Sequence, residues 1–141
     1  MFTGEFRHTI DGKGRVAVPA RFRAELAAGA TVCRWLENCV AIFPQQAWQE
    51  LADAASAQRY ADARARAFSR FLFSGAFEVE LDGQGRLVLP ASLRQFGGLK
   101  SEAVVVGAAD HIELWEPARW DGISAEMSSD EFAARIADLG V

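Results

Sequence analysis

Two short segments of this chain combine the residues of a tight turn with side chains that bind anions. The first reads Asp11-Gly-Lys-Gly-Arg15 and the second reads Asp82-Gly-Gln-Gly-Arg86. Glycine tolerates the positive φ angles of a hairpin turn and allows another molecule to approach the backbone closely. An arginine beside such a turn can donate two parallel hydrogen bonds to phosphate oxygens or to the edge of a guanine. The pattern therefore indicates a hairpin tip that contacts nucleic acid.

The same residues also allow a purely structural interpretation of both turns. Asp11 and Arg15 recur as Asp82 and Arg86 at the same spacing, and opposite charges on either side of a turn can pair and fix the hairpin. Both interpretations of the arginines remain open at this point. We assign four residues to building the turns: Asp11, Gly14, Asp82 and Gly85.

The two turns belong to an internal repeat with an offset of 71 residues. Phe6 to Arg23 aligns with Phe77 to Arg94, and the aspartate, both glycines, the arginine of the turn, the proline and the final arginine coincide. With an offset of 72 residues, Val40 to Trp48 matches Ile112 to Trp120. Agreement over so long a stretch indicates a duplication.

The residue pattern of each copy predicts elements in the order strand, turn, strand, helix, strand, strand. In the first copy the strands are expected over 6–10, 16–18, 31–36 and 39–43, with a short amphipathic helix over 20–26. In the second copy, strands are expected over 87–89, 103–106 and 111–115, with a helix over 91–96 that ends at two glycines. The chain is therefore expected to be mostly β with short helices.

Two further segments predict helices outside the repeat copies. Residues 45–70 are rich in Ala, Gln, Glu and Arg, which are strong helix formers. Ser128-Ser-Asp-Glu131 is a capping box that opens a helix near the carboxyl end. The predicted organisation is a first module over 5–47, a helical linker over 48–75, a second module over 76–119 and an acidic tail over 120–141.

The net charge of −4 argues against a nucleic-acid partner until it is counted by segment, because phosphate binders usually carry excess positive charge. Residues 1–100 carry 13 basic and 10 acidic side chains, a balance of +3, whereas residues 101–141 carry 2 and 9, a balance of −7. Local patches matter more for partners than the total charge. The basic amino-terminal part remains a candidate for binding DNA.

Other classes of function find little support in the sequence. Cys33 and Cys39 match no common zinc spacing and are expected to be buried or half-buried thiols. The two histidines come without a nucleophile and base constellation, and Gly12-x-Gly14 lacks the third glycine of a dinucleotide site. No stretch has the apolar length of a membrane span or of a signal peptide. We expect no enzyme activity, catalytic residue, metal, cofactor, small-molecule substrate or membrane contact.

The segment Asp11 to Pro19 resembles the AbrB-type swapped-hairpin fold, and nearly the whole chain resembles the MraZ family of transcriptional regulators. The resemblance includes the opening Met1-Phe2-x-Gly4, the second turn followed by Pro90, and the segment Glu113-Leu-Trp115. It implies an α+β fold in which two AbrB-like swapped-hairpin modules form a β-barrel, with a helical linker and a C-terminal helix.

The resemblance also implies a sequence-specific DNA-binding regulator that represses its own division and cell-wall operon. Such a protein binds short direct promoter repeats in double-stranded DNA as a closed ring of identical subunits, in the cytoplasm and associated with the nucleoid. We assign six residues to DNA contact: Arg7, Lys13, Arg15, Arg21, Arg23 and Arg86. The alternative is an antitoxin-like or scaffold module that docks a protein partner through its acidic tail.

The two turns differ in ways that bear on this assignment. Gln84 stands where the first copy has Lys13. Glu78 and Ser92 stand where the first copy has Arg7 and Arg21. The first copy is therefore the better candidate for binding DNA.

Overall fold

The eight strands fall into two sets of four that follow the two repeat copies. The computed structural model describes residues 1–141. The first copy holds β1 (Glu5–Thr9), β2 (Arg15–Ala17), β3 (Ala30–Arg34) and β4 (Val40–Pro44). The second copy holds β5 (Ala76–Val79), β6 (Arg86–Val88), β7 (Glu102–Gly107) and β8 (Ile112–Trp115). The strand order within each copy is therefore the one that the sequence predicts.

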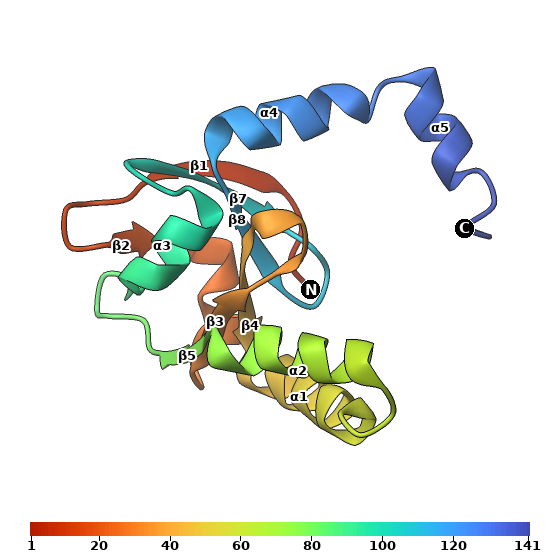
Figure 1. The fold of residues 1–141 in the computed structure, drawn as a ribbon. Coiled ribbons are helices and arrows are strands. Elements are labelled where there is room, and N and C mark those ends of the chain that lie inside the picture. Colours follow the sequence, from red (N-terminus) through yellow and green to blue (C-terminus); the bar gives the residue numbers. More distant parts are fainter.

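The two copies exchange their first strands. The larger sheet has the order β1-β7-β8-β4-β3-β5, and a second sheet pairs β2 with β6. In this arrangement β1 lies antiparallel to β7, with Phe6 opposite Val105, and β5 lies antiparallel to β3, with Phe77 opposite Val32. Figure 1 shows strands from both copies side by side in one body. The swapped-hairpin α+β fold is thus confirmed, and the exchange takes place within one chain.

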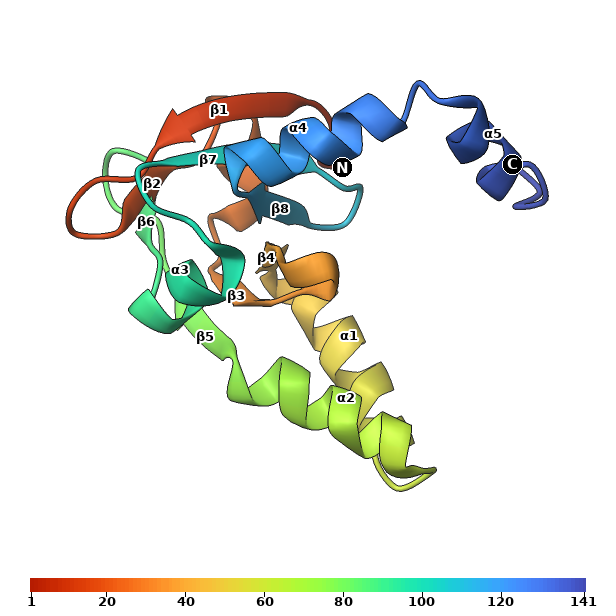
Figure 2. The same ribbon diagram turned by 45° about the horizontal axis from the view of Figure 1, so that its top comes forward.

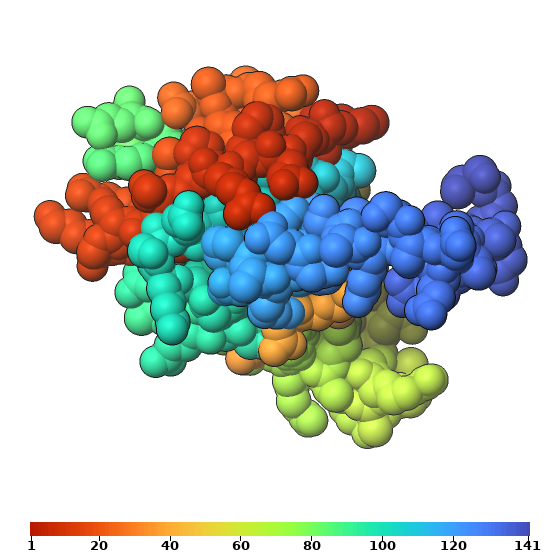
Figure 3. Space-filling model, turned by 90° about the horizontal axis from the view of Figure 1, so that it is seen from above, coloured from red at the N-terminus to blue at the C-terminus, as the bar shows by residue number.

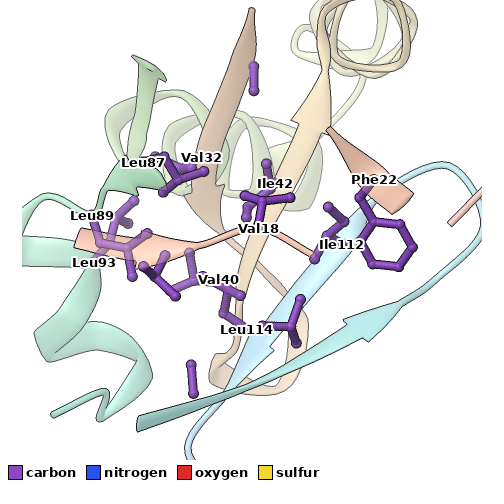
Figure 4. Packing of buried hydrophobic residues seen from close by; sticks show 14 of the residues in the cluster. Val18, Phe22, Val32, Val40, Ile42, Leu87, Leu89, Leu93, Ile112 and Leu114 are labelled. Atoms are coloured by element: carbon purple, nitrogen blue, oxygen red, sulfur yellow. The ribbon is translucent and has the colours of Figure 1, made fainter. Parts of the chain in front are cut away.

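A single hydrophobic core joins the two copies. Val18 of the first copy lies in the same buried cluster as Leu87, Leu89 and Leu93 of the second, and all four are at most 2% exposed (Figure 4). Burying one such side chain stabilises the fold by roughly 1.5–3 kcal/mol. Neither copy has a complete core of its own, so the two turns are held in a fixed relation to each other.

The segment after β2 differs from its counterpart after β6. The α-helix expected over 20–26 forms as two consecutive 3-10 turns, Ala20–Phe22 and Ala24–Leu26. Such turns are common in short pieces of chain, and they still bury Phe22 and Leu26. In the second copy α3 (Ala91–Gly97) is a true α-helix, and it ends at Gly98 with a φ of 65°.

The helical segment between the copies is a pair of packed helices, α1 (Gln45–Gln58) and α2 (Ala63–Ser74). Asp62 caps α2 by accepting a hydrogen bond from the backbone N–H of Ala65 at 2.9 Å. Leu72 packs on Phe43 of β4, and both are almost fully buried. Figure 2 shows the far ends of both helices extending away from the sheet.

The carboxyl end forms two helices where the sequence predicts one. An unexpected helix, α4 (Pro117–Glu126), begins at Glu116, whose carboxylate accepts hydrogen bonds from two backbone N–H groups of its first turn. In α5 (Asp130–Ile136) the capping residue is Ser129 rather than Ser128, and it accepts a hydrogen bond from the N–H of Phe132 at 3.1 Å. None of the helices is both long and apolar enough to cross a membrane.

Candidate nucleic-acid interface

Asp11 organises the first turn through its carboxylate. Its Oδ1 accepts hydrogen bonds from the backbone N–H groups of Lys13 (3.0 Å) and Arg15 (2.9 Å), and its Oδ2 accepts one from Nε of Arg15 at 2.6 Å. The N–H of Arg15 contributes most to lowering the pKa of Asp11 below its ordinary value of 3.8. The carboxylate therefore stays ionised at neutral pH and fixes both the turn and the arginine beside it.

The second turn has the same geometry. Oδ1 of Asp82 accepts from the N–H groups of Gln84 (2.9 Å) and Arg86 (3.0 Å), and Oδ2 accepts from Nε of Arg86 at 3.0 Å. The pKa of Asp82 is likewise lowered, chiefly by the N–H of Arg86. The structural and the DNA-binding interpretation of these arginines are compatible, because each arginine uses only its Nε to hydrogen-bond the aspartate that fixes the turn. The terminal nitrogens of Arg15 and Arg86 make no hydrogen bond within the protein.

The two turns differ in the charges around them. Lys13 is exposed and its ammonium group makes no ion pair. Its counterpart Gln84 is neutral, and the second turn is preceded by two exposed glutamates, Glu78 on β5 and Glu80 directly after it. The backbone is thus repeated, while the positive charge is concentrated at the first turn.

Arg7 and Arg21 have different surroundings although both lie in the first copy. Nη2 of Arg7 forms an ion pair with Oδ1 of Asp121 on α4 at 2.6 Å, and this contact raises the pKa of Arg7 further. Arg21 is exposed, lies about 6 Å from the rings of Phe6 and Phe22, and has no carboxylate partner. Of these two candidates, Arg21 alone presents a guanidinium free of negative charge.

Arg23 lies against the second turn rather than the first. Its Nε donates a hydrogen bond to the carbonyl of Val18 at 3.0 Å, and a Cβ placed on Gly85 would lie 2.2 Å from that nitrogen. Arg94 makes the reciprocal contact: its Nη1 donates to the carbonyl of Leu89 at 2.8 Å and covers Gly14. Our DNA-contact assignment did not include Arg94, although its alignment with Arg23 in the repeat was a signal that could have found it.

Three titratable side chains outside the turns, Cys33, Cys39 and His111, lie among packed residues. Cys33 and Cys39 are fully buried free thiols, as predicted, and burial raises the pKa of Cys33 to about 12. His111 stacks on the ring of Phe43 and contacts Asp110 and Glu113 at 2.8 and 3.0 Å. No cluster of three His, Cys, Asp or Glu side chains has the arrangement of a metal site.

The overall arrangement separates the turns from the acidic end of the chain. The loop between β1 and β2 lies at one end of the molecule, and α5 lies at the other (Figures 1 and 3). Fixed cations at one end and the carboxylates of α5 at the other allow an anionic partner to bind the turns without meeting α5.

Comparison with known proteins identifies the family. The model described as "MraZ protein, putative antitoxin-like" matches residues 1–71 and again 72–139, in agreement with the internal repeat. The chain is 46% identical over 143 residues to a protein of Moorella thermoacetica and 43% identical over 143 residues to one of Halothermothrix orenii, with 100% of each chain covered. A third relative, from Roseiflexus castenholzii, is 42% identical over 141 residues, covering 99% of each. All three are named transcriptional regulator MraZ. The chain belongs to the MraZ family of transcriptional regulators, and it is not an enzyme.

Proposed function

We propose that this regulator binds double-stranded DNA through its first turn, residues 11–15. The observation that carries the proposal is the pair of cations on either side of Gly14: exposed Lys13 and half-exposed Arg15, whose terminal nitrogens are free. Because Asp11 already fixes the turn, little conformational entropy is lost when it binds. A hairpin tip fits the major groove, where an arginine can hydrogen-bond the edge of a guanine or a phosphate oxygen beside the groove.

The second turn contributes less to this interface. It lacks the lysine, and the negative charges of Glu78 and Glu80 oppose the approach of phosphate. Arg86 remains available for one contact, and Arg21 adds an exposed cation on the side of the first copy. We infer that modules 5–47 and 76–119 each supply one turn and that the first dominates the affinity.

Assembly into a closed ring of identical subunits would repeat the dominant turn. A few phosphate contacts give a single chain only weak binding, and linking several turns in one particle raises the total affinity by 10²–10⁴-fold without any new contact. A ring also suits short direct repeats, since each repeat meets an identical turn. From the resemblance of the chain to its family, we propose that the assembly acts in the cytoplasm, associated with the nucleoid. There it would repress the operon of division and cell-wall genes to which its own gene belongs.

The test exploits the difference between the two turns. Lys13→Gln gives the first turn the residue of the second, and the exposed, unpaired lysine can be replaced without disturbing the fold. We expect weaker binding to duplex DNA from the region upstream of the gene, with the slope of log K against log salt reduced by about 1. Fluorescence anisotropy between 50 and 200 mM salt measures both.

Ser92→Ala is the matched control, because an exposed neutral side chain in the second copy is changed. Its DNA affinity should equal that of the wild type. Failure of the wild-type protein to bind this DNA at low salt, with its assembly intact, would exclude the proposal.

An antitoxin-like or scaffold role is the second candidate, and the exposed carboxyl end favours it. Ile136 and Leu139 are 41% and 65% exposed beside several carboxylates, so this segment could bind a basic protein. Co-purification of such a partner, together with DNA binding that depends on it, would support this role.

A further inference from the structure

Arg94 carries a half-buried positive charge without a carboxylate partner. It lies on α3 of the second copy, and its one hydrogen bond runs from Nη1 to the backbone carbonyl of Leu89. A guanidinium has five N–H donors, so most of its hydrogen-bonding capacity is unused within the chain. Partial burial of an uncompensated charge favours the approach of an anion.

The position of this charge connects it to the first turn. Gly14 has a φ of 79°, and a Cβ placed on it would lie 1.6 Å from Nη1 of Arg94. The guanidinium therefore lies directly on the glycine between Lys13 and Arg15. Three cations meet at one turn, two from the first copy and one from the second.

On the basis of the proposed function, we propose that Arg94 is a third DNA-contacting residue of the first turn. The phosphate site is then assembled from both copies, and it exists only because β2 of the first copy pairs with β6 of the second and brings α3 over Gly14. The unused donors of Arg94 bind a backbone phosphate that also contacts Lys13 or Arg15. This role gives the second copy a direct part in DNA binding at the first turn, in addition to the smaller contribution of its own turn.

Arg23 provides an internal comparison for this inference. It makes the equivalent hydrogen bond to Val18 and covers the equivalent Gly85, so its structural role matches that of Arg94. The turn that it covers has Gln84 in place of a lysine and follows Glu80. A role in the fold alone predicts equal effects for the two arginines, whereas a role in DNA binding predicts unequal ones.

The experiment compares Arg94→Gln with Arg23→Gln in the full chain. Urea unfolding should show similar losses of stability for both. Anisotropy with the upstream duplex should show that Arg94→Gln lowers the affinity about fivefold at 150 mM salt and reduces the salt slope by about 0.9, the amount expected for one phosphate contact. Arg23→Gln should lower both the affinity and the slope less, because the second turn that Arg23 covers contributes less to the interface.

Arg94→Lys extends the test to the charge itself. Lysine keeps the positive charge but not the planar fork of arginine, so the salt slope should return towards the wild-type value even if stability does not. This variant also keeps the inference testable if Arg94→Gln does not fold. Equal loss of affinity in the two glutamine variants, or an unchanged slope in Arg94→Gln, would limit Arg94 to a structural role and overturn the inference. Wild-type protein that does not bind the duplex would instead overturn the proposed function.

Discussion

Replacement of Gly14 by alanine tests the contact between the two copies most directly. The residue has a φ of 79°, and an added Cβ would lie 1.6 Å from Nη1 of Arg94 and 3.0 Å from the backbone carbonyl oxygen of Leu89. The flexible arginine must therefore move away, while the carbonyl cannot. The substitution combines strain in the turn with loss of the Arg94 hydrogen bond.

The magnitude follows from these two effects. An alanine in the left-handed region costs about 1–2 kcal/mol. Loss of a hydrogen bond from a charged donor to the carbonyl of Leu89 costs about 1.5–3 kcal/mol. We expect Gly14→Ala to lower the free energy of unfolding by about 3 kcal/mol, a large share of the stability of a domain of this size.

Urea denaturation followed by circular dichroism measures this loss. Gly12→Ala is the matched control, because no atom lies within 4 Å of a Cβ added there and its φ is outside the left-handed region. It should change the stability by less than about 0.5 kcal/mol. In an Arg94→Ala background, Gly14→Ala should cost about 1.5 kcal/mol less, since the displaced side chain is gone. Equal effects at Gly14 and Gly12 would refute the contact between the copies.

Half-buried His111 and fully buried Leu72, both outside the turns, give the remaining predictions. Burial lowers the pKa of His111, but its hydrogen bonds to Glu113 and Asp110 outweigh this and raise the pKa above 6.5. The stability that protonated His111 adds should be complete below pH 6.5 and should be lost as the pH rises through the folded-state pKa, so the urea midpoint should fall over this range. His111→Gln should make this fall smaller. Parallel pH profiles of the wild type and the variant would contradict the assigned charge of His111. Leu72→Ala should cost about 2–5 kcal/mol because the side chain is fully buried, whereas Leu139→Ala, 65% exposed, should cost almost nothing. Equal unfolding midpoints for these two variants would contradict the packing of α2 on the sheet.

The sequence predicts the parts of the fold that depend on local residues. The 71-residue offset identifies the repeat, and the Asp11 and Asp82 turns follow from residues four positions apart that hydrogen-bond one another. The strands of both copies follow from short apolar runs bounded by Gly and Pro. The family resemblance supplies the swapped arrangement, which local patterns do not contain.

Contacts between distant residues were not predictable in this way. The ion pair of Arg7 with Asp121 joins residues 114 positions apart, and it depends on α4, a helix for which Pro117 at the first position was the available signal. The contact of Arg94 with Gly14 likewise depends on the pairing of β2 with β6 across the two copies. Periodicity reports which face of an element is buried, but not which distant element covers it.

Strand exchange also affects how the chain folds during its synthesis. The last residue of β1, Thr9, pairs with Glu102, the first residue of β7, and 92 residues separate them. At 5–20 residues per second, roughly 5–20 s pass before the ribosome has made the partner of the first strand. During this interval the edge of β1 is unpaired. When two chains are being made close together, β1 of one chain can pair with β7 of the other instead of with its own β7. The arrangement that joins the two copies within one chain therefore also slows folding, because the pairing of β1 with β7 closes a long loop.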